Sequence, residues 1–280
     1  MAENNAADQS RIIFADTHCH LDFNVFNSNR EEILSSARAH GVTRILNPAI
    51  DVATSQAIVD MVAGLEGVYA AVGVHPNDAT TWDDESSLAI LEQLARRPKV
   101  VAIGEIGLDY YRDRAPKDMQ QSVFCKQLEL AKMVGLPVIV HTRASISDTL
   151  DILADWVTAR KVYNQPLAGY PGVLHSFSGN KHDALRAIEL GFFIGITGPV
   201  TFKNAPDLQK LVAALPIERI LIETDAPFMA PHQHRGKRNQ PEWVRLIAEK
   251  IADLQHRSLE ETAEQTTANA QRLFAWRDGG

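Results

Sequence analysis

Two histidines placed two residues apart begin the part of the sequence that could do chemistry. His18 and His20 lie within residues 16–22, D-T-H-C-H-L-D, directly after the apolar run at residues 11–15. That run predicts a buried strand, and side chains two apart on a strand point to the same side. Two imidazoles directed at one point supply half of a metal site. Cys19 is expected to face the other way as a small strand residue.

Further residues of ligand type follow other apolar runs in the same manner. They are His75, Glu105, His141, His175 and Asp225. The chain has ten histidines, and five of them fall at or just after the ends of predicted strands, whereas scattered surface histidines would mostly fall in helices and loops. In a barrel of parallel strands, these ends meet at one rim. The pattern therefore predicts one site assembled from several strands.

The residue types indicate which ions this site would bind and what they would do. Imidazoles and carboxylates suit Zn²⁺, Mn²⁺ or Fe²⁺, and the carboxylates also admit Mg²⁺. Even four of these five histidines, with the two carboxylates, exceed the needs of one tetrahedral ion, so we expect two ions that share a bridging carboxylate. Two ions about 3.5–4 Å apart can activate a water and stabilise an oxyanion. The chemistry predicted is hydrolysis, at phosphorus or at carbon.

The elements that must position these residues alternate regularly along the chain. Apolar runs predict strands at residues 12–18, 43–47, 68–72, 100–103, 137–141, 173–175, 192–195 and 219–225. Amphipathic segments predict helices at residues 30–40, 51–65, 86–97, 117–134, 146–159, 183–190 and 207–215. Strands that are apolar throughout and alternate with helices predict a parallel sheet with its outer face covered.

Closing that sheet as a (β/α)₈ TIM barrel is the economical solution at 280 residues. Two more predicted helices, at residues 241–254 and 259–274, follow the last strand. An open, doubly wound sheet is the rival α/β fold. It lacks its usual phosphate-binding G-x-G-x-x-G segment after the first strand. We therefore predict a single barrel domain at residues 11–277, after a loose polar tail at residues 1–10.

Composition sets limits on the class of protein. A formal net charge of −7 argues against a globally basic nucleic-acid coat, although metals and local cations can still bind phosphate. Cys19 and Cys125 do not make a disulfide scaffold, which fits a reducing cytoplasm. No apolar run is long enough to span a membrane, and the first ten residues hold no signal-peptide core. We expect a cytoplasmic monomer that is not bound to membranes.

A series of short blocks resembles one known family. The blocks are DTHCHLD, GVHP, GEIGLDY, VIVHTR, HSFSG, GPVTFKN, ETDAP and RGKRN, in that order from Asp16 to Asn239. Together they resemble the TatD-type metal-dependent deoxyribonucleases, a branch of the amidohydrolase-like barrels. The resemblance covers nearly the whole chain, and an ordered series of blocks is far more specific than H-x-H alone. It implies a distorted barrel, a cytoplasmic location and a divalent-metal nuclease that acts on DNA.

The resemblance also implies a role for each matching residue. His18 and His20 would hold the first ion together with Asp225, and Glu105 would bridge both ions. The second ion would be held by His141 and His175. His75 is implied to face the substrate beside the metals. Where the family usually shows N-E-P, this chain has Gln240 before its proline, which puts in doubt a charged support of that rim loop but leaves the ligands intact.

Several residues can be given chemical roles next to these ligands. We hypothesise that a metal-activated water attacks the substrate and that Asp225 accepts its proton. Arg143, two residues after His141, is a candidate phosphate contact. Further candidate cations lie in the loops after the fourth and eighth strands: Arg112, Arg114, Lys117, Arg235, Lys237 and Arg238. Tyr110 and Tyr111 could stack on a base or pack in the core.

Two questions stay open from the sequence. Each ligating imidazole should donate its other N–H to a carboxylate or carbonyl, for which Asp16, Asp22 and Asp109 are candidates. The substrate is most consistent with DNA, single-stranded or at duplex ends, cleaved by an exonuclease that uses two divalent ions (Mg²⁺, Mn²⁺ or Zn²⁺). The alternative is a hydrolase of the same barrel acting at carbon, on an amide, a lactone or an ester such as aminoacyl-tRNA.

Overall fold

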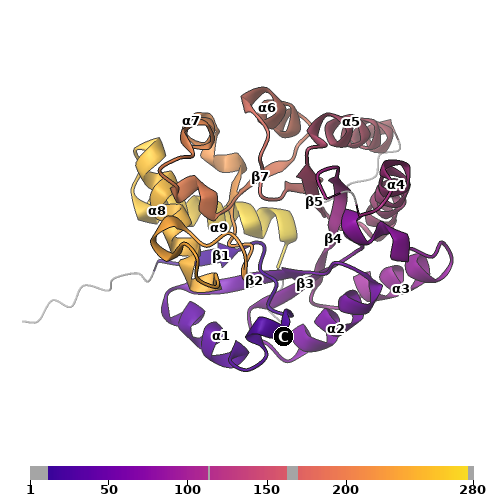
Figure 1. Ribbon diagram of the computed structural model, residues 1–280, viewed down its shortest axis with the longest axis horizontal. Helices are drawn as coiled ribbons and strands as arrows, with labels where there is room; N and C mark the ends of the chain where they lie inside the picture. Colours follow the sequence, from indigo (N-terminus) through magenta and orange to yellow (C-terminus); the bar gives the residue numbers. More distant parts are fainter. Residues whose placement is uncertain (1–11, 113, 163–169, 277–280) are drawn as a thin grey trace, which may run out of the picture.

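The structure is a computed structural model that describes residues 12–112, 114–162 and 170–276. Within these ranges, eight parallel strands lie side by side in chain order, and helices surround them (Figure 1). A hydrogen bond from the Thr17 N–H to the Ile222 carbonyl and a bridge between Cys19 and Ala226 join the last strand to the first. The sheet is thus a nearly closed barrel, which confirms the predicted fold. The tail predicted at residues 1–10 lies outside the described residues.

The strands and helices have the following bounds. The strands are β1 Phe14–Asp16, β2 Val42–Pro48, β3 Val68–Val72, β4 Val100–Asp109, β5 Val138–Arg143, β6 Gly172–Leu174, β7 Phe193–Ile196 and β8 Ile220–Ile222. The α-helices are α1 Arg30–Ala39, α2 Val52–Ala63, α3 Ser86–Ala95, α4 Lys117–Val134, α5 Ile146–Val162, α6 Lys181–Glu189, α7 Pro206–Ala214, α8 Val244–Gln255 and α9 Leu259–Phe274. Short 3₁₀ helices are η1 Asn24–Phe26, η2 Pro76–Thr81, η3 Gly198–Thr201, η4 Ile217–Arg219, η5 His232–His234 and η6 Pro241–Trp243.

Two apolar layers hold the barrel together. The larger one lies between the sheet and the helices and includes Phe14, Cys19 and Phe124. The smaller one fills the barrel itself, where Tyr69 packs against Trp276 from the end of the chain, with ring centroids 4.9 Å apart. Helix α9 therefore closes the end of the barrel at which the strands begin, which leaves the opposite rim free to carry a site.

The ends of three strands differ from the sequence prediction. The predicted strands at residues 12–18 and 219–225 are observed only as β1 and β8, three residues each, so neither His18 nor Asp225 lies on a regular strand. Strand β4 instead continues through Glu105 to Asp109, past the predicted end at residue 103. It does so because its second half pairs with β5, after a register shift between Ile103 and Ile106.

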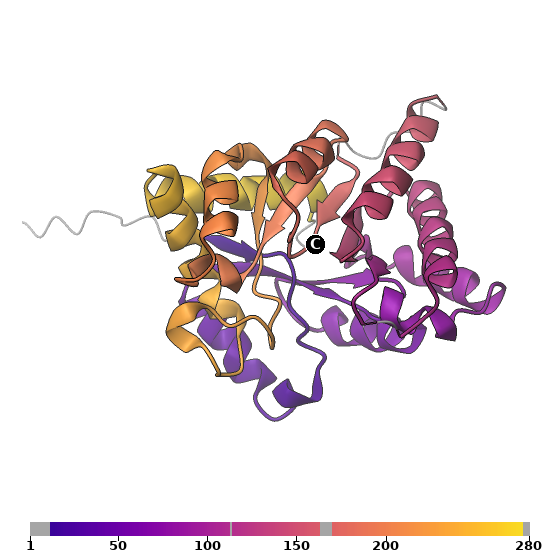
Figure 2. The same ribbon diagram turned by 45° about the horizontal axis from the view of Figure 1, so that its top comes forward.

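Strand order places two pairs of neighbouring strands across the barrel from each other. The β8–β1 junction lies on the side covered by α8, whereas β4 and β5 lie on the side covered by α4 and α5 (Figure 1). The tilted view in Figure 2 shows the same separation of the two sides. Among the described residues, no helix is both long and apolar enough to cross a bilayer.

Candidate metal centre

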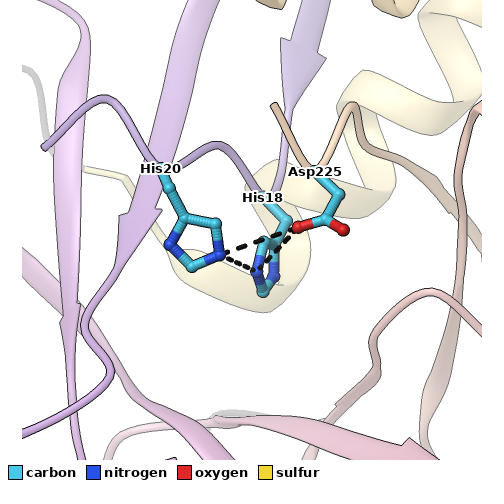
Figure 3. Close-up of side chains that lie close together, drawn as sticks. All are labelled: His18, His20 and Asp225. Carbon is cyan, nitrogen blue, oxygen red and sulfur yellow. Dashed lines mark hydrogen bonds and ion pairs between the residues drawn. The ribbon is translucent and has the colours of Figure 1, made fainter. Parts of the chain in front are cut away.

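Three predicted ligands meet at the β8–β1 junction, and we refer to His18, His20 and Asp225 as the first donor set (Figure 3). The two Nε2 atoms of the histidines lie 3.3 Å apart. The Asp225 Oδ1 atom lies 3.8 Å from His18 Nε2 and 3.6 Å from His20 Nε2. All three side chains are buried. Two ring nitrogens and one carboxylate oxygen therefore converge on one point.

Backbone hydrogen bonds, rather than a long strand, fix the first donor set. The Asp225 N–H donates to the His18 carbonyl at 2.8 Å, and the His20 N–H donates to the Ala226 carbonyl at 2.8 Å. Asp225 itself has a φ of +54°, a conformation that few non-glycine residues adopt. The prediction that His18 and His20 share one face of a regular strand is therefore wrong, although their rings do converge.

Glu105 on β4 lies between two groups of histidines. Its Oε2 atom is 3.4 Å from His18 Nε2 and 3.9 Å from His20 Nε2. Its Oε1 atom is 2.9 Å from His141 Nδ1 and 3.7 Å from His75 Nε2. Each carboxylate oxygen thus faces a different group of imidazoles, which is the arrangement a bridging carboxylate needs. We refer to His141 and His175, the two histidines expected to hold the second ion, as the second donor set.

A carboxylate lies behind each histidine of the second donor set. His141 Nε2 lies 3.2 Å from Asp109 Oδ2, and His175 Nδ1 lies 2.9 Å from Glu223 Oε1. The latter contact is an ion pair whose angle departs from that of a linear hydrogen bond. A carboxylate attracts the ring proton to the nitrogen that it faces. When an ion displaces the second ring proton, the lone pair used to bind it is therefore the one on His141 Nδ1 or His175 Nε2, the atoms that face the centre.

His175, although assigned to the second donor set, lies directly against the first. Its ring stacks on that of His18 with centroids 3.4 Å apart, and its Nε2 lies 3.9 Å from Asp225 Oδ1. The ligand atoms of His18, Glu105 and His175 all lie within 4.8 Å of one another, as do those of His75, Glu105 and His141. The structure therefore brings His175 closer to the first donor set than the sequence suggested, and offers His75 as a second neighbour of His141.

Hydrogen bonding argues against His75 as a ligand. The Asn77 N–H donates to His75 Nδ1 at 3.0 Å, so this nitrogen carries no proton. Burial lowers the pKa of His75 to about 3, so the ring is neutral at pH 7. A neutral imidazole has one N–H, which must then be on Nε2, where no lone pair is left to bind a metal. His75 accordingly presents a hydrogen-bond donor to the centre.

The carboxylates of the centre have opposite pKa shifts. Burial raises the pKa of Asp225 to about 6, and the nearby imidazoles of His175 and His20 only partly offset this. Burial also acts to raise the pKa of Glu105, but the surrounding imidazoles, among them the His141 ring 2.9 Å from Oε1, outweigh burial and hold that pKa well below its usual range. At pH 7 Glu105 is a fixed anion, while Asp225 is close to a pKa at which it can exchange a proton.

The donor atoms fit divalent ions. His18 Nδ1 and His20 Nδ1 are buried without a hydrogen-bond partner among the described residues, and the facing Nε2 atoms lie 3.3 Å apart. Such contacts between ring nitrogens are unfavourable unless a proton or a cation lies between them. Imidazole and carboxylate donors suit Zn²⁺ and Mn²⁺, and the carboxylates admit Mg²⁺. The residues present thus include several groups that fit a divalent metal ion.

A cavity of about 1170 Å³ opens above the donor sets. Of the cations predicted near the site, Arg112, Arg114 and Arg143 line it. Lys181 and Lys210 also line it and were not expected from the sequence.

Other predicted cations and tyrosines interact elsewhere. Lys117 lies over the Tyr110 ring, 4.4 Å from its centroid. The Tyr110 hydroxyl donates to Asp148 at 2.9 Å, which favours packing over base stacking for this residue. Arg235 lies over the Phe202 ring, and Arg238 donates to the Val25 carbonyl. The loop after β4 therefore supplies cations to the cavity, and among the described residues the loop after β8 does not.

Of the three carboxylates proposed to orient imidazoles, only Asp109 contacts a ligand ring. Asp16 instead accepts hydrogen bonds from the side chain and the N–H of Thr224, at 2.6 and 2.8 Å. Asp22 accepts from the Asn47 amide at 2.9 Å. Glu223 was not predicted from the sequence. Its position could have indicated a role, because Glu223 directly follows an apolar strand and lies two residues before Asp225, so that both side chains could face the same side of the chain.

Comparison with known proteins identifies the family of the chain. The family model described as TatD related DNase matches residues 15–275. An uncharacterized metal-dependent hydrolase, YabD of Bacillus subtilis, is 41% identical over 259 residues, which covers 92% of this chain and 98% of that protein. A Cronobacter sakazakii protein named 3'-5' ssDNA/RNA exonuclease TatD is 35% identical over 255 residues, with 89% and 93% of the two chains covered.

The crystal structure of YjjV, a TatD homolog from Escherichia coli K12, superimposes with a TM-score of 0.86 at 34% identity, covering 94% of this chain and 98% of that one. The barrel and its ring of imidazoles and carboxylates define a metal-dependent hydrolase. The chain belongs to the TatD family, as its sequence blocks predicted.

Proposed function

We propose that the chain is a two-metal phosphodiesterase that removes nucleotides from an end of DNA. The observation that carries the proposal is Glu105, whose two oxygens face different imidazoles at the base of a cavity lined by cations. Shared carboxylates of this kind suit in-line displacement at phosphorus, where both the attacking and the leaving oxygen need stabilisation. The relative named as an exonuclease supports the same substrate class.

The proposed ligands follow from the donor atoms. His18 Nε2, His20 Nε2, Asp225 and Glu105 Oε2 would hold one ion. Glu105 Oε1, His141 Nδ1 and His175 Nε2 would hold the other. When bound, such ions supply Lewis acidity and lower the pKa of water so that it can attack at neutral pH.

The remaining roles belong to side chains near the ligands. Asp225 Oδ1 lies within 3.6–3.9 Å of three imidazole nitrogens, which places it at the middle of the centre, where it can accept the proton of the attacking water. The His75 Nε2–H donates to a phosphoryl oxygen. Arg143 and Arg112 bind phosphates further along the chain, because guanidinium groups match phosphate geometry.

Digestion of end-labelled DNA by metal-stripped protein tests the proposal. Mg²⁺, Mn²⁺ and Zn²⁺ are added back separately to single- and double-stranded substrates, with Glu105→Ala as the control. We expect metal-dependent shortening that is lost in the variant by more than about 10³-fold, beyond the effect of removing a single stabilising group. If no metal restores cleavage while the protein still binds ions, the phosphodiester assignment is wrong. Esters and amides at carbon are then the substrates to screen.

A further inference from the structure

An apolar shelf lies at one side of the cavity, formed by Phe23, Phe228 and Met229. Phe228 is 49% exposed and Met229 is 41% exposed, which is high for large apolar side chains. Phe23 packs edge-on against Phe228, with ring centroids 5.6 Å apart. Both rings adjoin His20, at centroid distances of 4.9 Å for Phe23 and 6.4 Å for Phe228. The shelf therefore borders the first donor set.

The shelf is fixed in place although it is exposed. The Phe228 N–H donates to the Asp225 carbonyl at 2.8 Å, and the Asn239 amide donates to the Phe228 carbonyl at 2.6 Å. The Ser176 hydroxyl contacts Met229 Sδ at 3.2 Å. Apolar side chains held rigidly at the mouth of a cavity are costly in water unless a ligand covers them. Their position suggests that part of the substrate does so.

The opposite side of the cavity has a different chemistry. Arg112 and Arg114 follow β4, and Arg143 ends β5, which lie across the barrel from the β8–β1 junction (Figure 1). The Arg143 guanidinium lies 4.0 Å from the centroid of the Tyr111 ring, which orients it. Asp109 contacts the His141 ring, and it pairs with Arg143 where β4 and β5 end. These cations therefore border the second donor set. An anion is attracted to this side, and a flat apolar group is accommodated on the shelf.

We infer that the shelf receives the nucleobase on one side of the scissile phosphodiester, while the phosphates on its other side extend over Arg112, Arg114 and Arg143. This inference rests on the proposed function. A nucleobase fits because its faces are flat and apolar and stack on aromatic rings whatever its identity. A base that stacks on the shelf is not paired, so single-stranded or frayed ends are the substrates that this geometry favours.

Substrates that differ only in one base test the inference. Single-stranded oligonucleotides of equal length carry an abasic tetrahydrofuran residue at the 3′ end, at the 5′ end or at neither. The wild type is compared with Phe228→Ala, with Phe228→Tyr, which keeps the ring, and with Leu185→Ala. Leu185 on α6 is 38% exposed and does not line the cavity, so it matches Phe228 as an exposed apolar residue. Bound metal is measured for every variant.

We expect the wild type to prefer a terminal base over an abasic end by roughly 5- to 150-fold in kcat/KM, the range for one stacked base. Phe228→Ala should lose that preference while binding as much metal as the wild type. Phe228→Tyr and Leu185→Ala should keep it.

Three results would overturn the inference. The wild type could cleave both kinds of end equally well, or Phe228→Ala could slow both by the same factor. In either case the nuclease assignment stands and only the shelf assignment is lost. If the metal-loaded wild type cleaves none of the oligonucleotides, the proposed function fails and the inference fails with it.

Discussion

The two donor sets are built in different ways. His18 and His20 come from one short segment, and their Nδ1 atoms have no hydrogen-bond partner within the described part of the chain. His141 lies on β5 and His175 directly follows β6, and each ring faces a carboxylate, Asp109 and Glu223 respectively. The first set is held by its own backbone, whereas the second depends on neighbouring side chains for the orientation and the protonation of its rings.

This difference also appears in the pKa values. Burial and the adjacent His175 lower the pKa of His18 well below its usual range. Burial acts in the same direction on His175, but the facing Glu223 carboxylate outweighs it and raises the pKa to about 10. In metal-free protein at pH 7, the His18 ring is therefore already free to bind an ion, whereas His175 carries a proton that an ion must displace. The two sites should respond differently to substitution and to pH.

The largest difference between the two donor sets is expected from Asp225→Asn, which changes a residue of the first set. An amide cannot accept the proton of the attacking water, so kcat should fall by roughly 10²–10⁴-fold in metal-loaded protein. Binding of the second ion should change little. Single-turnover cleavage with metal content measured in parallel checks this. Near-normal turnover of the loaded variant would remove Asp225 from the role of base.

A smaller effect, confined to the second set, is expected from Gly195→Ala on β7. A Cβ at this position would overlap the Glu223 carboxylate. Displacing Glu223 removes the group that orients His175, so affinity for one of the two ions should fall about 10–100-fold. Calorimetric titration with Mn²⁺ measures both affinities. Gly64→Ala is the matched control, since a Cβ there meets nothing within 4 Å. An equal loss of affinity for both ions would contradict the assignment of Glu223 to the second set.

The pH dependence of metal binding should separate the two sites further. Because the ion displaces the His175 proton, whose pKa is about 10, affinity for the second ion should rise with pH from 7 to 9, by up to about tenfold per unit. Affinity for the first ion should level off above the Asp225 pKa of about 6. Titrations in buffers of different ionisation enthalpy count the protons released. If the affinities for both ions change with pH in the same way, the expected difference between the two sites is wrong.

The smallest effect is expected from Arg143→Gln, beside the second set. Loss of one phosphate contact should raise KM by roughly 3- to 10-fold, leave kcat nearly unchanged and make the salt dependence of binding shallower. Arg186→Gln serves as the control, because Arg186 pairs with Asp151 at 2.7 Å away from the cavity. A fall in kcat at constant KM would assign Arg143 to the reaction step instead.

Hydrophobic periodicity was enough to predict the fold. Helix α4 is observed at Lys117–Val134, as predicted, because the spacing of apolar residues in a long amphipathic segment shows which face of the helix is buried. The ends of β1 and β8 could not be predicted in this way. Their geometry depends on backbone hydrogen bonds between segments about 200 residues apart, such as the bond from Asp225 to His18.

The composition of the site was partly predictable for a related reason. Ligand-type residues at strand ends identify a rim, which is why His141 and Asp225 were found. The sequence does not show which carboxylate faces which ring. Glu223 reaches His175 only because Gly195 on the next strand leaves room for its carboxylate. The shelf at Phe228 was not predicted, because an apolar residue in a sequence is expected to be buried, and only the structure shows that this one is exposed.

The central claim is that Glu105 divides two ions between the two donor sets. Anomalous scattering from crystals grown with Mn²⁺ tests it most directly. We predict two peaks: one beside Glu105 Oε2 with the ring nitrogens of His18 and His20, and one beside Glu105 Oε1 with His141 Nδ1 and His175 Nε2. A single peak, or a second ion bound through His75 Nε2, would contradict the account.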